Sequence, residues 1–396
     1  MFLHGIFPPI TTPFYPDGRV YLKKLEHNVD RYSKTPVAGI TVLGSTGEAI
    51  LLSDEERREV LATAREACAP NKVLIAGTGA ESASETLRLT DYAAELGYDV
   101  ALVRTPHFYR PQMHPPNQLA FYRTVADRSA IPVLIYSVPG FTNYDMPEEL
   151  IVELAAHPNI IGIKESSGDV EKVRRLAVAT KHIQRAATVT EIFSAVTPRM
   201  LKAGKPEAAQ SHHELIPVGA VASASKEASG ASFPSPGAEP SSQGLGAPRT
   251  SDAGTRPPGA KAGVAVPSSA AIAILAGLKT RQKEVGFQVL AGTAQRLQPC
   301  LEAGAVGAVL AFSTPAPTAC YEIYAAWKEG DSALANLKQE RISLAAARIA
   351  SQIGIPGLKY ALDLNGYYGG PPRLPLLPLT ADLKKEVEQL MLDIRN

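Results

Sequence analysis

The chain has 396 residues, of which 45% are hydrophobic and 20% are charged, and its formal net charge at pH 7 is +1. This composition is typical of a soluble globular protein, and a nearly neutral chain gives no electrostatic reason to bind nucleic acid or an acidic membrane surface. No basic leader and no run of about 18 apolar residues is present, so we expect a cytoplasmic protein without a membrane span. We expect the three cysteines, which lack CxxC spacing, to be buried free thiols.

Strand-like and helix-like segments alternate along the first 180 residues. The predicted strands are 5–14, 39–44, 73–79, 100–106, 132–139 and 160–167. The predicted helices are 21–34, 53–68, 82–97, 117–129, 145–157 and 170–180. Capping signals open three of the helices, at Ser53 with Glu56, at Ser82 with Glu85, and at Asp145 with Pro147 in the first helical position. The strands are continuous apolar runs, which is the pattern of a sheet covered on both faces.

A segment of unusual composition interrupts this alternation. Of the 38 residues from 223 to 260, 27 are Gly, Pro, Ser or Ala. Such a segment cannot bury enough apolar surface to offset its ordering entropy, so we predict disorder over 205–268. The flanks 189–204 and 265–286 have helical apolar spacing. His212, His213 and Glu214 lie in polar surroundings, which favours a solvated loop over a metal site.

The alternation resumes after the insertion. We predict strands at 287–293 and 305–313, a helix between them that ends near Gly304, further helices over 317–352, and a C-terminal helix over 380–395. Eight buried strands, most of them followed by a helix, predict an α/β fold of the (β/α)8 TIM barrel type. The expected divisions are 1–181 (six β/α units), 182–285 (insertion), 286–316 (strands seven and eight) and 317–396 (eighth helix and helical extension).

Reactive residues of such a barrel lie at the carboxyl ends of its strands, and Lys164 lies there at the end of an apolar run. A buried ammonium is costly unless it is paired, exposed or deprotonated, and a deprotonated lysine can attack a ketone. The plain alternative is an ion pair or a lysine that reaches solvent. Side-chain alternation turns Gly162 inward with Lys164, which predicts room for a small ligand beneath the amine. The same alternation turns Tyr136 toward that amine, a pairing that suits carbonyl chemistry.

Four motifs occur in the order and spacing of a known family. They are GSTGE at 44–48, YSVP at 136–139, GIKESSGD at 162–169 and RLPL at 373–376. Together they resemble the dihydrodipicolinate synthase/N-acetylneuraminate lyase family, whose members are class I pyruvate-dependent aldolases. The resemblance covers nearly all of 5–180 and 286–396. Within the family the chain looks most like 4-hydroxy-2-oxoglutarate aldolase, above all at GYYGGPPRLPL (366–376).

The resemblance implies a role for each matching residue. Lys164 would form a Schiff base with the 2-oxo group of a small 2-oxo acid, and Tyr136 would relay protons. The residues implied to bind substrate in the pocket are Ser45, Thr46, Gly47 and, through its backbone, Val309. Thr46 would also join the proton relay, and no metal or organic cofactor is needed because the protonated imine accepts the electrons. The family further implies a homo-oligomer, a tetramer or a dimer.

Two positions depart from the family pattern. Phe108 stands where the family often places a tyrosine of the proton relay, so the relay would be shortened or use Tyr109. Phe141 stands where dihydrodipicolinate-forming members carry an arginine that binds the carboxylate of aspartate semialdehyde, although Arg104, Arg110 or a residue of the insertion could substitute. We count both phenylalanines among the residues expected at the substrate.

These departures set the order of the functional hypotheses. The first is a carbon–carbon lyase that reversibly cleaves 4-hydroxy-2-oxoglutarate, or a similar 4-hydroxy-2-oxo acid, to pyruvate and glyoxylate or another aldehyde. The alternatives are a 4-hydroxy-tetrahydrodipicolinate synthase and a catalytically silent barrel that binds a 2-oxo acid.

Overall fold

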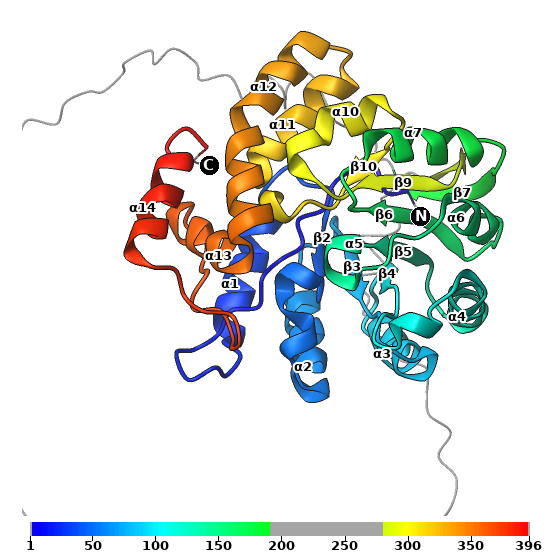
Figure 1. Ribbon diagram of the computed structural model, residues 1–396, viewed down its shortest axis with the longest axis horizontal. Helices are drawn as coiled ribbons and strands as arrows, with labels where there is room; N and C mark the ends of the chain where they lie inside the picture. Colours follow the sequence, from blue (N-terminus) through cyan, green and yellow to red (C-terminus); the bar gives the residue numbers. More distant parts are fainter. Residues whose placement is uncertain (1, 191–279, 395–396) are drawn as a thin grey trace, which may run out of the picture. The chain divides into compact units, whose positions relative to one another are not determined.

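The computed structural model describes residues 2–190 and 280–394 (Figure 1). Its strands lie at the centre, and helices surround them. The central strands are β1 (Gly5–Ile6), β2 (Gly39–Val42), β3 (Val73–Gly77), β4 (Val100–Arg104), β5 (Val133–Ser137), β6 (Ile160–Glu165), β9 (Gln288–Ala291) and β10 (Gly307–Ala308). All neighbouring pairs are parallel, in the order β1-β10-β9-β6-β5-β4-β3-β2.

Hydrogen bonds between the segments of β1 and β2 close this sheet into a barrel. The Ala38 N–H donates to the Ile6 carbonyl (3.0 Å), and the Ile10 N–H donates to the Thr41 carbonyl (2.9 Å). A parallel bridge between Pro9 and Thr41 continues the pairing. A closed sheet has no exposed edge, so the predicted (β/α)8 barrel is confirmed.

The helices follow the strands as the alternating pattern predicts. They are α1 (Leu22–Ser33), α2 (Asp54–Ala67), α3 (Ala83–Glu95), α4 (Pro115–Arg128), α5 (Pro139–Thr142), α6 (Glu148–Ala155), α7 (Val170–Ala179), α10 (Leu297–Glu302), α11 (Pro317–Lys328), α12 (Ser332–Ala345), α13 (Ile355–Leu364) and α14 (Ala381–Leu390). A π-helical segment, Ala346–Ile353, joins α12 to the turn before α13. In Figure 1 the last two helices lie beside α1 and form the predicted C-terminal extension.

The capping predictions succeed for two helices and fail for the third. Ser53 and Glu56 form a complete capping box at α2, and the Ser82 hydroxyl accepts a hydrogen bond from the Glu85 N–H at α3 (3.2 Å). The prediction that Asp145 caps the next helix is wrong, because α6 begins at Glu148 with Pro147 as its N-cap. The Asp145 carboxylate instead pairs with the buried ammonium of Lys172 on α7, an interaction that no local pattern predicts.

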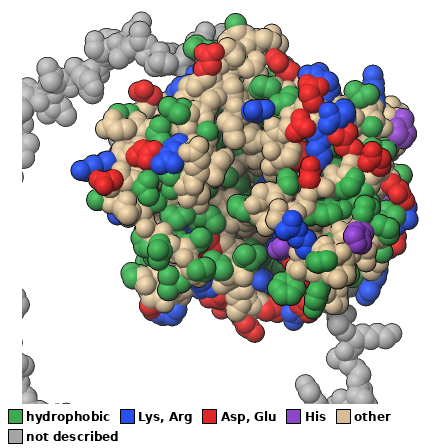
Figure 2. Space-filling model, in the orientation of Figure 1, with side chains coloured by type: hydrophobic (Ala, Val, Ile, Leu, Met, Phe, Trp, Pro, Cys, Tyr) green, Lys and Arg blue, Asp and Glu red, His purple; other side chains and the backbone are tan. Residues whose placement is uncertain are grey.

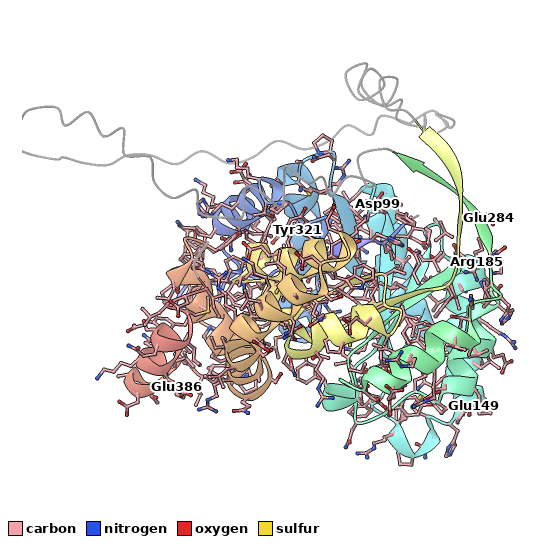
Figure 3. The ribbon with its side chains drawn as sticks, turned by 90° about the horizontal axis from the view of Figure 1, so that it is seen from above. Asp99, Glu149, Arg185, Glu284, Tyr321 and Glu386 are labelled. Atoms are coloured by element: carbon pink, nitrogen blue, oxygen red, sulfur yellow. The ribbon has the colours of Figure 1, made fainter. Side chains whose placement is uncertain are left out.

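The chain leaves and re-enters the barrel through a two-stranded antiparallel ribbon. β7 (Arg185–Thr190) pairs with β8 (Thr280–Val285), with Arg185 opposite Val285 and Thr190 opposite Thr280. Figure 3 shows the two strands running side by side away from the barrel. The helical spacing predicted for 265–286 is therefore wrong over 280–285, because pairing with a distant strand overrides a local pattern. The predicted disorder over 205–268 and the His212-His213-Glu214 group lie outside the described residues.

Two layers of apolar side chains fill the barrel and cover it. The inner layer lies within the barrel and consists of Leu3, Phe7, Val73, Ile75, Val100, Leu102, Leu134, Tyr136, Val138, Ile161, Leu290 and Val309. Alternate residues, such as Ala101, Val103, Ile135 and Ile163, face the helices. All three cysteines are buried and free, as predicted. The inner layer closes the barrel below the mouth, so the carboxyl ends of the strands form the floor of any site.

Candidate functional site

Three side chains form one inward row at the mouth of the barrel. Strand register pairs Arg104 with Tyr136 and Tyr136 with Lys164. Residues two positions earlier, Leu102 and Leu134, belong to the inner layer, so alternation turns the whole row inward. We call Arg104, Tyr136 and Lys164 the inner row.

Lys164 is buried against the phenol ring of Tyr136. Lys164 is 4% exposed, and its Nζ lies 4.0 Å from the centroid of the Tyr136 ring. Within residues 2–190 and 280–394 no carboxylate forms an ion pair with this amine. Lys164 is therefore neither a member of a structural ion pair in the described residues nor a strand-end lysine that reaches solvent.

Gly162 does not leave room for a ligand, contrary to the sequence-based prediction. A Cβ atom at this position would lie 2.2 Å from the backbone oxygen of Gln288 on the adjacent β9. Gln288 is itself buried, and its side-chain oxygen accepts a hydrogen bond from the Leu3 N–H (2.6 Å). The glycine is therefore needed for the close approach of two strands, and it does not provide space for a ligand.

The GSTGE segment places Ser45 over Tyr136. Ser45–Gly47 forms a single 3-10 turn directly after β2, and the Ser45 hydroxyl lies 3.1 Å from the Tyr136 hydroxyl. The N–H groups of Gly47 and Glu48 donate within the turn. Those of Ser45 and Thr46 have no hydrogen-bond acceptor in the described part of the chain. Two N–H donors and two hydroxyls in one turn form a suitable cradle for a carboxylate.

A buried ion pair supports this turn from below. Glu48 has left-handed backbone (φ 54°), and its carboxylate binds the Lys359 ammonium at 2.5 Å, with both side chains at most 1% exposed. The Arg373 N–H donates to the same carboxylate (2.8 Å), and Lys359 also donates to the Thr12 carbonyl (2.9 Å). Burial lowers the pKa of Lys359 to about 8, although the Glu48 carboxylate opposes this shift. Sequence reasoning missed this support, since Lys359 lies 311 positions from Glu48.

The remaining predicted residues are Val309 and the two phenylalanines. Val309 is fully buried in the inner layer, and its N–H donates to the Ala291 carbonyl (2.9 Å). Phe108 and Phe141 are 75% and 69% exposed. The structure therefore does not bring either phenylalanine into the inner row.

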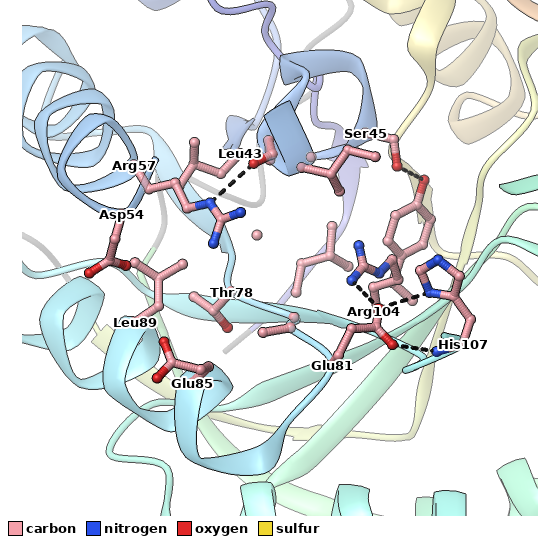
Figure 4. A pocket seen from close by; sticks show the side chains of 18 residues that line it. Leu43, Ser45, Asp54, Arg57, Thr78, Glu81, Glu85, Leu89, Arg104 and His107 are labelled. Carbon is pink, nitrogen blue, oxygen red and sulfur yellow. Dashed lines mark hydrogen bonds and ion pairs between the residues drawn. The ribbon is translucent and has the colours of Figure 1, made fainter. Parts of the chain in front are cut away.

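A cavity of about 390 Å³ opens beside Arg104 and Tyr136 of the inner row, and Lys164 is not one of its lining residues. Its lining includes Ser45, Tyr136, Arg104, Glu81 and His107, from the turns that follow β2, β3 and β4 and from the strand ends (Figure 4). Figure 2 shows a hollow near the centre of this view, with hydrophobic side chains gathered along part of its border. The cavity gives small polar molecules access to the phenol of Tyr136.

The described residues contain neither a metal-binding cluster nor a membrane-spanning helix. No group of three or more His, Cys, Asp or Glu side chains is arranged to hold a metal ion in residues 2–190 and 280–394. No helix in the same part of the chain is long and apolar enough to cross a bilayer.

Comparison with curated proteins finds relatives that match part of their length. A 4-hydroxy-tetrahydrodipicolinate synthase of Stenotrophomonas maltophilia is 41% identical over 176 residues, which are 44% of this chain and 59% of the relative. One of Methanoculleus marisnigri is 38% identical over 179 residues, 45% of this chain and 60% of the relative. The chain thus spans about three fifths of the length of the curated relatives that it matches.

Comparison with solved structures and family models covers more of the chain. A dihydrodipicolinate synthase of Bacillus anthracis superposes with a TM-score of 0.70 over 100% of both chains, at 19% identity, which shows the fold alone. The model of the dihydrodipicolinate synthetase family matches residues 2–226 and 271–393. The chain therefore belongs to the dihydrodipicolinate synthetase family.

Proposed function

We propose that this protein is a pyruvate-dependent carbon–carbon lyase of class I, in which Lys164 forms a Schiff base with a 2-oxo acid. The observation that carries the proposal is the buried Lys164 amine, without a carboxylate partner in the described residues and in contact with Tyr136. The Tyr136 hydroxyl in turn meets the Ser45 hydroxyl at 3.1 Å. A nucleophile, a proton carrier and a polar turn then surround one reaction centre.

The proposed reaction follows from these positions. The Lys164 amine attacks C2 of the 4-hydroxy-2-oxo acid, water leaves, and a protonated imine forms. The Tyr136 phenol gives its proton to the departing water, and the resulting phenolate accepts the proton of the C4 hydroxyl as the C3–C4 bond breaks. The bonding electrons move into the imine to give an enamine, and the aldehyde leaves. C3 takes the proton back from Tyr136, and water hydrolyses the imine to release pyruvate and the free lysine, with its surplus proton returned to the Tyr136 phenolate. Ser45 and Thr46 hold the carboxylate next to C2, and no metal or organic cofactor takes part.

The substrate that we favour is 4-hydroxy-2-oxoglutarate, cleaved to pyruvate and glyoxylate. Phe141 supports this choice, because an exposed phenyl ring cannot form the carboxylate contact that an arginine makes in the dihydrodipicolinate-forming members. The names of the curated relatives favour a second candidate, 4-hydroxy-tetrahydrodipicolinate synthesis from pyruvate and aspartate semialdehyde.

A direct comparison of the two reactions separates these candidates from each other and from a silent barrel. We expect the full-length protein to release pyruvate from 4-hydroxy-2-oxoglutarate with a larger kcat/KM than it shows in consuming aspartate semialdehyde with pyruvate. A larger value for the semialdehyde would establish the synthase instead. Absence of both reactions would identify a barrel that binds a 2-oxo acid without converting it.

Replacement of Tyr136 by phenylalanine tests the proton relay. We expect kcat to fall by about 100-fold or more, since a positioned acid–base group contributes roughly 10²–10⁴-fold. Tyr122→Phe is the matched control, because it also removes a buried phenol hydroxyl, one that donates to the Val103 carbonyl outside the barrel. Equal kcat values for the two variants would remove Tyr136 from the relay.

We also propose that the protein forms a homo-oligomer. Phe108 and its neighbour Tyr109 are 75% and 68% exposed, and their rings meet edge to face with centroids 5.3 Å apart. Exposed aromatic pairs are enriched at interfaces between subunits. Light scattering after gel filtration should give a mass of two or four chains, and a monomer would contradict the proposal.

A further inference from the structure

Arg104 occupies a place in the site that the proposed chemistry leaves without a role. It pairs in register with Tyr136 on one side, and Tyr136 pairs with Lys164 on the other. Neighbouring parallel strands are about 4.8 Å apart, so Arg104 and Lys164 originate about 10 Å from each other across the mouth. This span is suitable for a short molecule held at both ends, with the reacting bond near Tyr136.

The segment that follows β3 packs closely against the backbone of Arg104. Gly79, which follows β3, has no side chain, and a Cβ atom there would lie 2.3 Å from the backbone nitrogen of Arg104. Figure 4 shows the Arg104 guanidinium directed toward the cavity, near Glu81 and His107. The glycine lets the segment after β3 approach the Arg104 backbone closely, and both residues line the cavity.

The Glu81 carboxylate accepts a hydrogen bond from only one of the Arg104 guanidinium nitrogens. Glu81 accepts a hydrogen bond from Arg104 Nη2 at 2.9 Å, while Arg104 Nε is buried and has no partner in the described residues. Glu81 is also fixed by the N–H groups of His107 (2.8 Å) and Phe108 (2.9 Å). Burial alone would raise the pKa of Glu81, but these N–H groups, together with the charges of His107 and Arg104, outweigh it and the pKa is lowered. Glu81 is thus a fixed anion that orients Arg104 without using all of its donors.

We propose that Arg104, at the end of β4, binds the carboxylate of the aldehyde half of the substrate, at a place in the barrel mouth different from that of Phe141 on α5. The inference rests on the proposed function. An arginine presents several N–H donors in one plane, so it can keep Glu81 on one nitrogen and bind a substrate carboxylate through others. Ser45 and Thr46 hold the carboxylate next to the imine, and Arg104 holds the one at the far end. The site selects substrates with two carboxylates.

The rival anchor is Arg110. Its guanidinium lies 2.5 Å and 3.1 Å from the side-chain oxygen of Asn143 once the amide is oriented to accept. It is not among the residues that line the cavity. Arg104 lines the cavity together with Ser45 and Tyr136, and so it is the better placed of the two.

The test compares two substrates that differ only at the far end. 4-Hydroxy-2-oxoglutarate carries the second carboxylate, and 4-hydroxy-2-oxopentanoate carries a methyl group in its place. For Arg104→Gln we expect kcat/KM to fall by about 10- to 100-fold on the first substrate, the range of a charged hydrogen bond, and by less than about 3-fold on the second. Arg104→Lys should recover part of the loss, because it keeps the charge without the planar donor set. Arg123→Gln, which breaks an exposed pair with Glu153, is the matched control.

Trapping of pyruvate with borohydride, measured on the same variants, keeps the two proposals apart. Wild type that does not trap pyruvate contradicts the proposed function. If wild type and Arg104→Gln both trap pyruvate, the fold and the imine are intact, and the substrate ratio alone decides the role of Arg104. Equal losses on both substrates, no loss, or a selective loss in Arg110→Gln instead would overturn the inference.

Discussion

Lys164→Met is expected to reduce pyruvate release to the background rate. The loss should be at least about 1,000-fold in kcat, or about 4 kcal/mol of activation free energy, because no other group in the inner row can form the imine. Methionine has nearly the length of lysine and suits the apolar surroundings of the buried side chain, so the fold should persist. Steady-state kinetics with a thermal unfolding curve for each protein measures both effects.

Lys164→Arg is the control for charge. Arginine keeps a cation at the same place but cannot form a Schiff base with a ketone, and we therefore expect the same loss as for methionine. Substantial activity in either variant would mean that the carbon–carbon bond is cleaved without a lysine imine, and a different mechanism would be required.

Lys359→Met is expected to be the most destabilising substitution in the barrel mouth. It leaves the Glu48 carboxylate buried without its ammonium partner, and the loss of one member of a buried pair costs about 3–5 kcal/mol of unfolding free energy. The Ser45–Gly47 turn directly precedes Glu48, so KM for the 2-oxo acid should also rise. Chemical denaturation and substrate titration measure the two effects.

The double variant Glu48→Gln with Lys359→Met separates the pair from general packing. With both charges removed, no ion is left unpaired, and at least half of the lost unfolding free energy should return. If the double variant is as unstable as the sum of the two single variants, the charges are not coupled and the loss comes from packing alone.

The barrel could be predicted from sequence because its strands are apolar on both faces. Strands such as β6 (Ile160–Glu165) consist mainly of apolar residues. The helices that follow the strands begin with strong capping signals, as at Ser53 and Ser82. The failures share one physical cause. Asp145, Thr280–Val285 and Gly162 each interact with residues far away in the chain, and these contacts override the local pattern.

The candidate site could be predicted only in part for the same reason. Alternation along two adjacent strands brings Tyr136 and Lys164 together, and motif spacing locates Ser45. The place of Arg104 in the inner row depends on the register between β4 and β5, which the sequence does not define. Lys359 forms an ion pair with Glu48 across a separation of 311 residues. Such a pairing is visible only in the folded protein.

Reduction with borohydride in the presence of pyruvate tests the central claim most directly. The full-length protein should gain the mass of one reduced pyruvate imine, peptide mapping should locate it on Lys164, and Lys164→Met should remain unmodified. An unmodified Lys164, or a pyruvate adduct on another lysine, would contradict the proposal that this residue carries the reaction.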